Sequence, residues 1–184
     1  MTPTKKLIVP VALSAMLFGA PTTTMYRCNL TRSSEDFFPN LTPEADLSAC
    51  LKYLANTDFG FVHQVLTFTR RQNESITAAS KEFNPHLLDN LISLKKYGPV
   101  YLTEREFQNK LEQVEGAYYR FLARSLLESK SRDFWDYHRK GWKAVPMRID
   151  RARIAKYVAA EILNIIGNPK STLGRVAGHF RRRK

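Results

Sequence analysis

The segment that decides the fold spans residues 103–128 and reads TEREFQNKLEQVEGAYYRFLARSLLE. It begins with a capping box, in which the Thr103 hydroxyl accepts from the backbone amide of Glu106 while the Glu106 carboxylate reaches back. Mostly apolar residues then recur at spacings of three or four, at Phe107, Leu111, Val114, Tyr118, Leu122 and Ser125. This is the period of an amphipathic helix, so the segment predicts one long helix that ends near Glu128.

Two further helices are predicted on the C-terminal side. A short aromatic helix covers about residues 132–139, and Asp150 caps another helix that ends at Gly167, followed by Asn-Pro. In this last helix the residues expected to face the core are Ile154, Val158, Ile162 and Ile165. Residues 171–184 form a short basic amphipathic piece that ends in Arg-Arg-Arg-Lys.

Two more helices are predicted on the N-terminal side. Asn84-Pro85 opens one that runs to about Lys96 and is closed by Gly98-Pro99. Thr42-Pro43 opens the other, which ends at residues 56–58 and has one apolar face made of Leu47, Cys50, Leu51 and Leu54. Between them, residues 59–70 are rich in Phe, Val and Thr and predict a strand. The chain is therefore expected to be mostly helical, with one strand that needs partners for pairing.

The composition limits the classes of protein to which the chain can belong. The chain has 184 residues, 43% of them hydrophobic, which suits one packed domain and excludes a disordered chain. The net charge is +12, and residues 148–184 hold ten basic residues against two acidic ones. This excess favours an anionic partner. A nucleic acid ranks last, because no recognition motif accompanies the charge.

The N-terminus and the cysteines leave two questions open. Lys5-Lys6 precede an apolar stretch at residues 7–20, which is typical of a signal peptide but also of a buried strand or helix, and which is too short to cross a membrane. Cys28 and Cys50 cannot form a dense disulfide framework, and nothing near them has zinc spacing. Cys50 is expected to be a buried free thiol.

Few residues point to chemistry. Asp133, Asp136 and His138 could be imagined around a metal, but a solvated polar helix face is favoured. Asp46 lies in the first turn of its predicted helix, where the helix dipole favours an ionised carboxylate. That position suits a general base, although acidic residues stabilise first turns whether or not they do chemistry.

Five segments occur in an order and at spacings that resemble the C-terminal half of a family 2 glycosyltransferase. The resemblance covers about residues 18–169 and rests on GAPTTTMYR (19–27), EADLSACL (44–51), DFGFVHQVLTFTR (58–70), KYGPVYLT (96–103) and DFWDYHR (133–139). It implies an α/β fold of GT-A type, here truncated, mostly helical and with a small remnant β segment near the N-terminus. It also implies four parts: an apolar segment at 1–18, the end of the catalytic domain at 19–82, an appended helical region at 83–170 and a basic tail at 171–184.

The resemblance also implies a reaction and its residues. Sugar passes from a nucleotide-sugar to a glycan or lipid-linked acceptor by in-line displacement, and Asp46 matches the aspartate that acts as general base. Arg70 and Ser75 match an Arg-x-His-x-x-Ser stretch near the donor diphosphate, with Gln72 where histidine is usual. Gly19 and Ala20 match a small-residue segment near the donor sugar.

One departure concerns the donor. The family's nucleotide pocket and Asp-x-Asp site for Mg or Mn should precede Gly19, where this chain has eighteen residues without paired aspartates. The expectation is a transferase fragment that is inactive alone and cytoplasmic, with a basic tail that can touch a membrane. The alternative is an exported or peripheral basic helical protein that binds an anionic surface.

Overall fold

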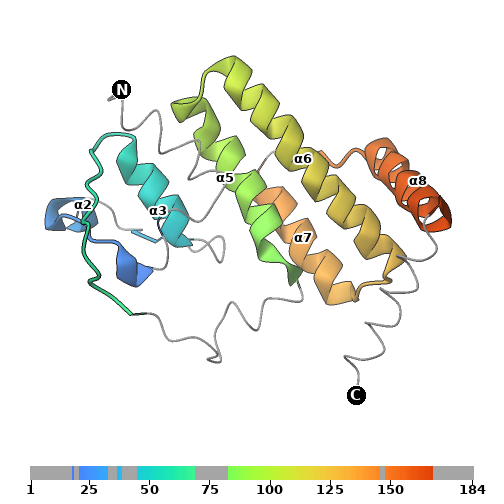
Figure 1. The fold of residues 1–184 in the computed structure, drawn as a ribbon, viewed down its shortest axis with the longest axis horizontal. Coiled ribbons are helices and arrows are strands. Elements are labelled where there is room, and N and C mark those ends of the chain that lie inside the picture. The colour runs from blue at the N-terminus through green and yellow to red at the C-terminus, as the bar shows by residue number, and fades with distance from the viewer. Residues whose placement is uncertain are drawn as a thin grey trace.

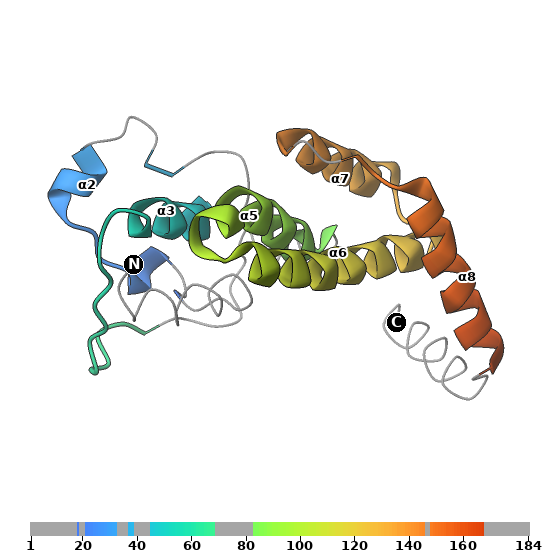
Figure 2. The same cartoon turned by 90° about the horizontal axis from the view of Figure 1, so that it is seen from above.

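The computed structural model describes residues 18, 21–32, 37–38, 45–68, 83–145 and 148–167. In chain order the elements are η1 (Pro21–Thr23), α2 (Cys28–Arg32), α3 (Ala45–Leu54), α5 (Pro85–Tyr101), α6 (Glu104–Leu127), α7 (Arg132–Ala144) and α8 (Arg151–Gly167). The helices α5, α6 and α7 lie side by side, and α8 packs against the C-terminal half of α6 (Figures 1 and 2). None of the helices in these ranges is long and apolar enough to span a bilayer.

The prediction of an α/β fold with a remnant strand is wrong for the described part of the chain, which contains helices and no strand. Residues 59–68 have the composition of a strand but lie as irregular chain, and all of their side chains except that of Phe59 are exposed. A strand exists only when its backbone groups pair with a neighbour, and no segment in the described ranges pairs with these residues. The prediction of a strand was wrong because it relied on local β propensity, which does not supply a pairing partner.

The long helix and its capping box are confirmed. The Glu106 amide donates to the Thr103 hydroxyl at 3.4 Å, and the Thr103 amide donates to the Glu106 carboxylate at 2.9 Å. The C-terminal half of the predicted face is buried at Tyr118, Leu122 and Ser125. These side chains meet α5 and the loop after α7, in a cluster of Leu88, Leu91, Ile92, Tyr118, Leu122 and Val145.

Thr103→Ala should lower the free energy of unfolding by about 1 kcal/mol, because the first turn of α6 loses its cap. Thr103→Ser keeps the hydroxyl and should change stability by less than about half of that. Urea unfolding followed by circular dichroism measures both variants. Equal stability of the alanine and serine variants would show that the cap contributes nothing.

The predicted stop at Gly98-Pro99 is wrong, because α5 continues through Pro99 to Tyr101. A proline removes the hydrogen bond to the preceding turn but does not prevent the next residues from remaining helical. Gly98 also has no Cβ, and a Cβ there would lie 2.6 Å from the Phe107 ring. The helix ends at Leu102, whose amide donates to the Gly98 carbonyl at 2.8 Å, and this places Phe107 of α6 against α5.

A second cluster surrounds α3. The predicted apolar face of that helix is confirmed, since Leu47, Cys50, Leu51 and Leu54 are all buried. They pack with Phe18, Leu94, Tyr97 and Tyr101, and the Tyr101 hydroxyl donates to the Leu51 carbonyl. The predicted start of this helix, Thr42-Pro43, lies outside the described residues.

The register of α8 was predicted only in part. Asp150 caps the helix by accepting from the Arg153 amide at 3.1 Å, and Ile154 and Val158 are half-buried as expected. Ile162 and Ile165, however, are exposed, whereas Glu161 is buried and pairs with Arg124 at 2.8 Å. An ion pair with the neighbouring helix therefore decides which side of the last two turns faces the bundle.

Candidate functional site

The carboxylate of Asp46 lies in the first turn of α3, as predicted, and is half-buried. Its Oδ1 accepts from the Leu47 amide at 2.8 Å. Because the opposite face of α3 is packed into the cluster around it, the carboxylate has a fixed support and remains in reach of solvent. A general base needs both properties.

Cys50 lies one turn further along α3 than Asp46 and is paired with a tyrosine from an earlier part of the chain. The Tyr26 hydroxyl and the Cys50 sulfur are 2.8 Å apart. Burial, and secondarily this contact, raises the pKa of Tyr26, and burial raises the pKa of the Cys50 thiol. Both groups are therefore neutral near pH 7. The prediction of a buried free thiol at Cys50 is confirmed.

The residues around Gly19 and Ala20 lie beside α3. Gly19 and Ala20 themselves are outside the described residues, but Phe18 before them is buried against α3. The Thr23 hydroxyl donates to the Phe18 carbonyl at 2.7 Å and so ties the two ends of this short stretch together. Arg70 and Ser75 also fall outside the described residues, and their predicted place near a donor diphosphate stays a prediction.

The imagined metal site at Asp133, Asp136 and His138 does not form. Asp133 is exposed, and Asp136 pairs with Arg139 at 2.8 Å. His138 is fully buried on the other side of α7. Among the described residues no group of three His, Cys, Asp or Glu side chains could hold a metal ion. They therefore do not fit the divalent cation that the resemblance implies.

His138 instead belongs to a buried hydrogen-bonded chain. Its Nε2 lies 3.0 Å from the Phe83 carbonyl, which can only accept, so Nε2 carries the hydrogen. Its Nδ1, 2.9 Å from the Tyr118 oxygen, then accepts from that hydroxyl, and the same oxygen accepts from the indole of Trp142. Every polar group of this chain has a partner when His138 is neutral. The chain ties α6, α7 and the start of α5 together.

Acid should weaken the fold through His138. Burial lowers its pKa from 6.5 to about 4, so the unfolded chain binds a proton between these values and the folded protein does not. The stabilisation is therefore complete above about pH 6.5 and is lost as the pH falls toward 4. From about pH 8 to about pH 5, the free energy of unfolding should fall by about 2 kcal/mol more in the unmodified protein than in His138→Phe. Urea unfolding at both pH values measures this, and equal falls would contradict the assignment.

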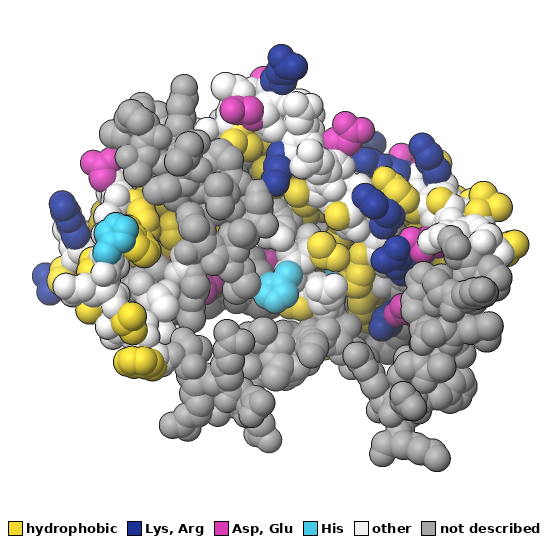
Figure 3. Space-filling view, in the orientation of Figure 1, with side chains coloured by type: hydrophobic (Ala, Val, Ile, Leu, Met, Phe, Trp, Pro, Cys, Tyr) yellow, Lys and Arg dark blue, Asp and Glu magenta, His cyan; other side chains and the backbone are white. Residues whose placement is uncertain are grey.

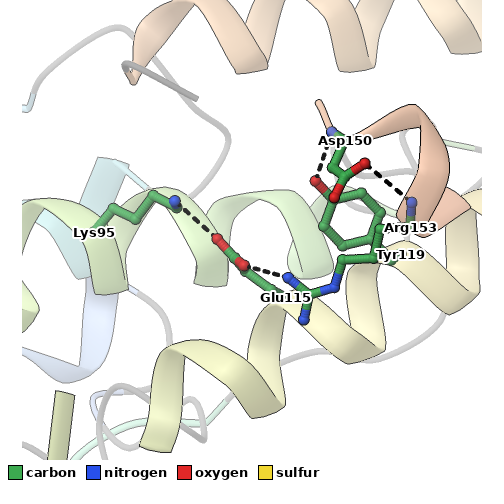
Figure 4. A network of polar contacts seen from close by, with 5 residues as sticks. All are labelled: Lys95, Glu115, Tyr119, Asp150 and Arg153. Atoms are coloured by element: carbon green, nitrogen blue, oxygen red, sulfur yellow. Dashed lines mark hydrogen bonds and ion pairs between the residues drawn. The ribbon is translucent and has the colours of Figure 1, made fainter. Parts of the chain in front are cut away.

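A polar network between α5, α6 and α8 was missed by the sequence analysis. Glu115 pairs with Lys95 at 2.9 Å and with Arg153 at 2.8 Å, while the Tyr119 hydroxyl accepts from the Asp150 amide at 3.0 Å (Figure 4). This polar network borders an open groove of about 760 Å³ between α6 and α8. The groove is lined by Gln108, Asn109, Leu111, Glu112, Glu115, Asp150, Ala152, Arg153, Lys156 and Tyr157. No motif signals it, because its members are far apart in the chain and come together only in the fold.

Compared with protein-family models, with curated proteins and with solved structures, the chain gives no significant match.

Proposed function

We propose that this chain is the acceptor-side part of an enzyme that transfers a sugar from a nucleotide-sugar to an acceptor hydroxyl, with Asp46 as general base. The observation that carries the proposal is the convergence of four of the five resembling segments on one cluster. Phe18 and Tyr26 flank or belong to the first segment, α3 carries the second, Phe59 belongs to the third, and Tyr97 and Tyr101 belong to the fourth.

The contacts among these segments are specific. The first segment meets the second through the Tyr26 hydroxyl and the Cys50 sulfur, 2.8 Å apart. The fourth meets the second where the Tyr101 hydroxyl donates to the Leu51 carbonyl. Phe59 of the third lies against Phe18, with ring centroids 5.6 Å apart. Segments that are separate in sequence thus surround the helix that bears Asp46, as a shared site would require.

The chemistry assigned to Asp46 is a proton transfer. Its carboxylate removes the proton of the acceptor hydroxyl while the acceptor oxygen bonds to the anomeric carbon and the nucleoside diphosphate leaves with the electrons of the broken bond. The dipole of α3 favours the charged carboxylate before transfer. The nucleotide pocket and any cation are assigned to a second polypeptide, and no particular sugar or acceptor is assigned.

Release of nucleoside diphosphate from nucleotide-sugars tests this function. The full chain is assayed alone and together with the polypeptide encoded directly upstream of it, with glycan and lipid-linked acceptors. Turnover is expected in the mixture and not with the chain alone. Turnover by the chain alone would contradict the placement of donor binding elsewhere, and a mixture without turnover for any donor would contradict the proposed function.

A further inference from the structure

The outward face of α8 is apolar along its whole length. At helical spacing it presents six exposed residues: Ala152, Ala155, Ala159, Ile162, Leu163 and Ile166. Leu163 and Ile166 are each 70% exposed and Ile162 is 41% exposed. In both ribbon views α8 lies at the end of the molecule opposite α3, so that other described helices leave this face uncovered (Figures 1 and 2).

The inward face of the same helix carries two of its four charged residues. Arg153 pairs with Glu115 at 2.8 Å and the buried Glu161 pairs with Arg124 at 2.8 Å. Apolar residues lie on both sides of the helix, because Ile154 and Val158 are half-buried whereas Leu163 and Ile166 are exposed. A surface helix whose outer side is in water has one apolar face, directed to the core. Figure 3 shows hydrophobic and basic side chains next to one another at the α8 end of the molecule. Exposed apolar patches of this kind mark contact with a protein or a membrane.

The basic charge next to this face favours a membrane over a protein as its partner. Residues 168–184 follow α8 directly in the sequence and contain six basic residues and no acidic one. Arg151 and Lys156 on α8 are exposed as well. An apolar helix face combined with clustered Lys and Arg has the chemistry that binds anionic headgroups and the upper part of the acyl chains.

We propose that the outward face of α8 lies on an anionic lipid bilayer. Ile162, Leu163 and Ile166 enter the headgroup region, and Arg151 and Lys156 lie at the lipid phosphates. The helix rests in the plane of the surface and does not cross it. This inference does not depend on the proposed transfer activity, because its readout is lipid binding.

Sedimentation with vesicles tests the proposal on the full chain. Vesicles of phosphatidylcholine with one-third phosphatidylglycerol should bind the protein, while vesicles of phosphatidylcholine alone should bind it at least about tenfold more weakly. Leu163→Gln with Ile166→Gln should lower the partition coefficient for the anionic vesicles about tenfold or more. The control pair Val65→Gln with Val100→Gln changes two exposed valines elsewhere and should bind as the unmodified protein does.

Three results would overturn the proposal. The first is equal binding to neutral and anionic vesicles, and the second is binding that the α8 pair leaves unchanged. The third is a dimer in sedimentation equilibrium that the α8 pair disrupts, in a protein that does not bind vesicles, because the face would then join two copies of the chain. The two α8 substitutions are at exposed positions, so the variant should fold, and its circular dichroism spectrum checks this.

Discussion

Replacing His138 with phenylalanine should lower the free energy of unfolding by about 3 kcal/mol near neutral pH. The imidazole is fully buried, and the phenyl ring that replaces it is somewhat larger and has no hydrogen-bonding atoms. The Phe83 carbonyl then loses its donor, and the Tyr118 hydroxyl loses its acceptor. Each buried polar group left without a partner costs about 1–3 kcal/mol.

Two further variants show whether the loss belongs to the hydrogen-bonded chain. Tyr118→Phe should also be destabilised, because it leaves the Trp142 indole N–H and the His138 Nδ1 without partners. The double variant should lose less than the sum of the two single losses, since both disrupt the same contacts. His63→Phe changes an exposed histidine and should alter stability by less than about 0.5 kcal/mol. A His138→Phe protein as stable as His63→Phe would contradict the structural role.

Local signals in the sequence predicted much of the helical fold. The capping box at Thr103 and the apolar face of α3 depend on residues within two turns of one another, and both are present as expected. The strand at 59–70 and the inward register of Ile162 and Ile165 failed for one shared reason. Each depended on a distant neighbour, a pairing strand in one case and Arg124 opposite Glu161 in the other.

In the candidate site, too, only the features that depend on nearby residues could be predicted from the sequence. The place of Asp46 in a first helical turn follows from the nearby sequence and is confirmed. Its neighbours Tyr26 and Cys50 could not be paired in advance, because twenty-three residues lie between them and their contact exists only in the packed cluster. His138, which the sequence placed on a polar helix face, is buried because Tyr118 and Phe83 satisfy both ring nitrogens.

Replacing Asp46 with asparagine should lower the rate of sugar transfer at least about a hundredfold in the mixture with the upstream polypeptide. Asparagine has the shape of aspartate, and its carbonyl oxygen can still accept from the Leu47 amide, so α3 should keep its structure. What is lost is the ability to take the acceptor's proton. The turnover number should therefore fall while the Michaelis constant for the acceptor changes little.

Asp133→Asn is the matched control, because Asp133 is also an aspartate in the first turn of a helix, is exposed and lies on α7. The measurement that tests the account most directly is nucleoside diphosphate release by the mixture with each variant, alongside the unmodified chain. The account predicts full activity for Asp133→Asn and a loss of at least about a hundredfold for Asp46→Asn. Transfer at the unmodified rate by the Asp46→Asn protein would contradict it.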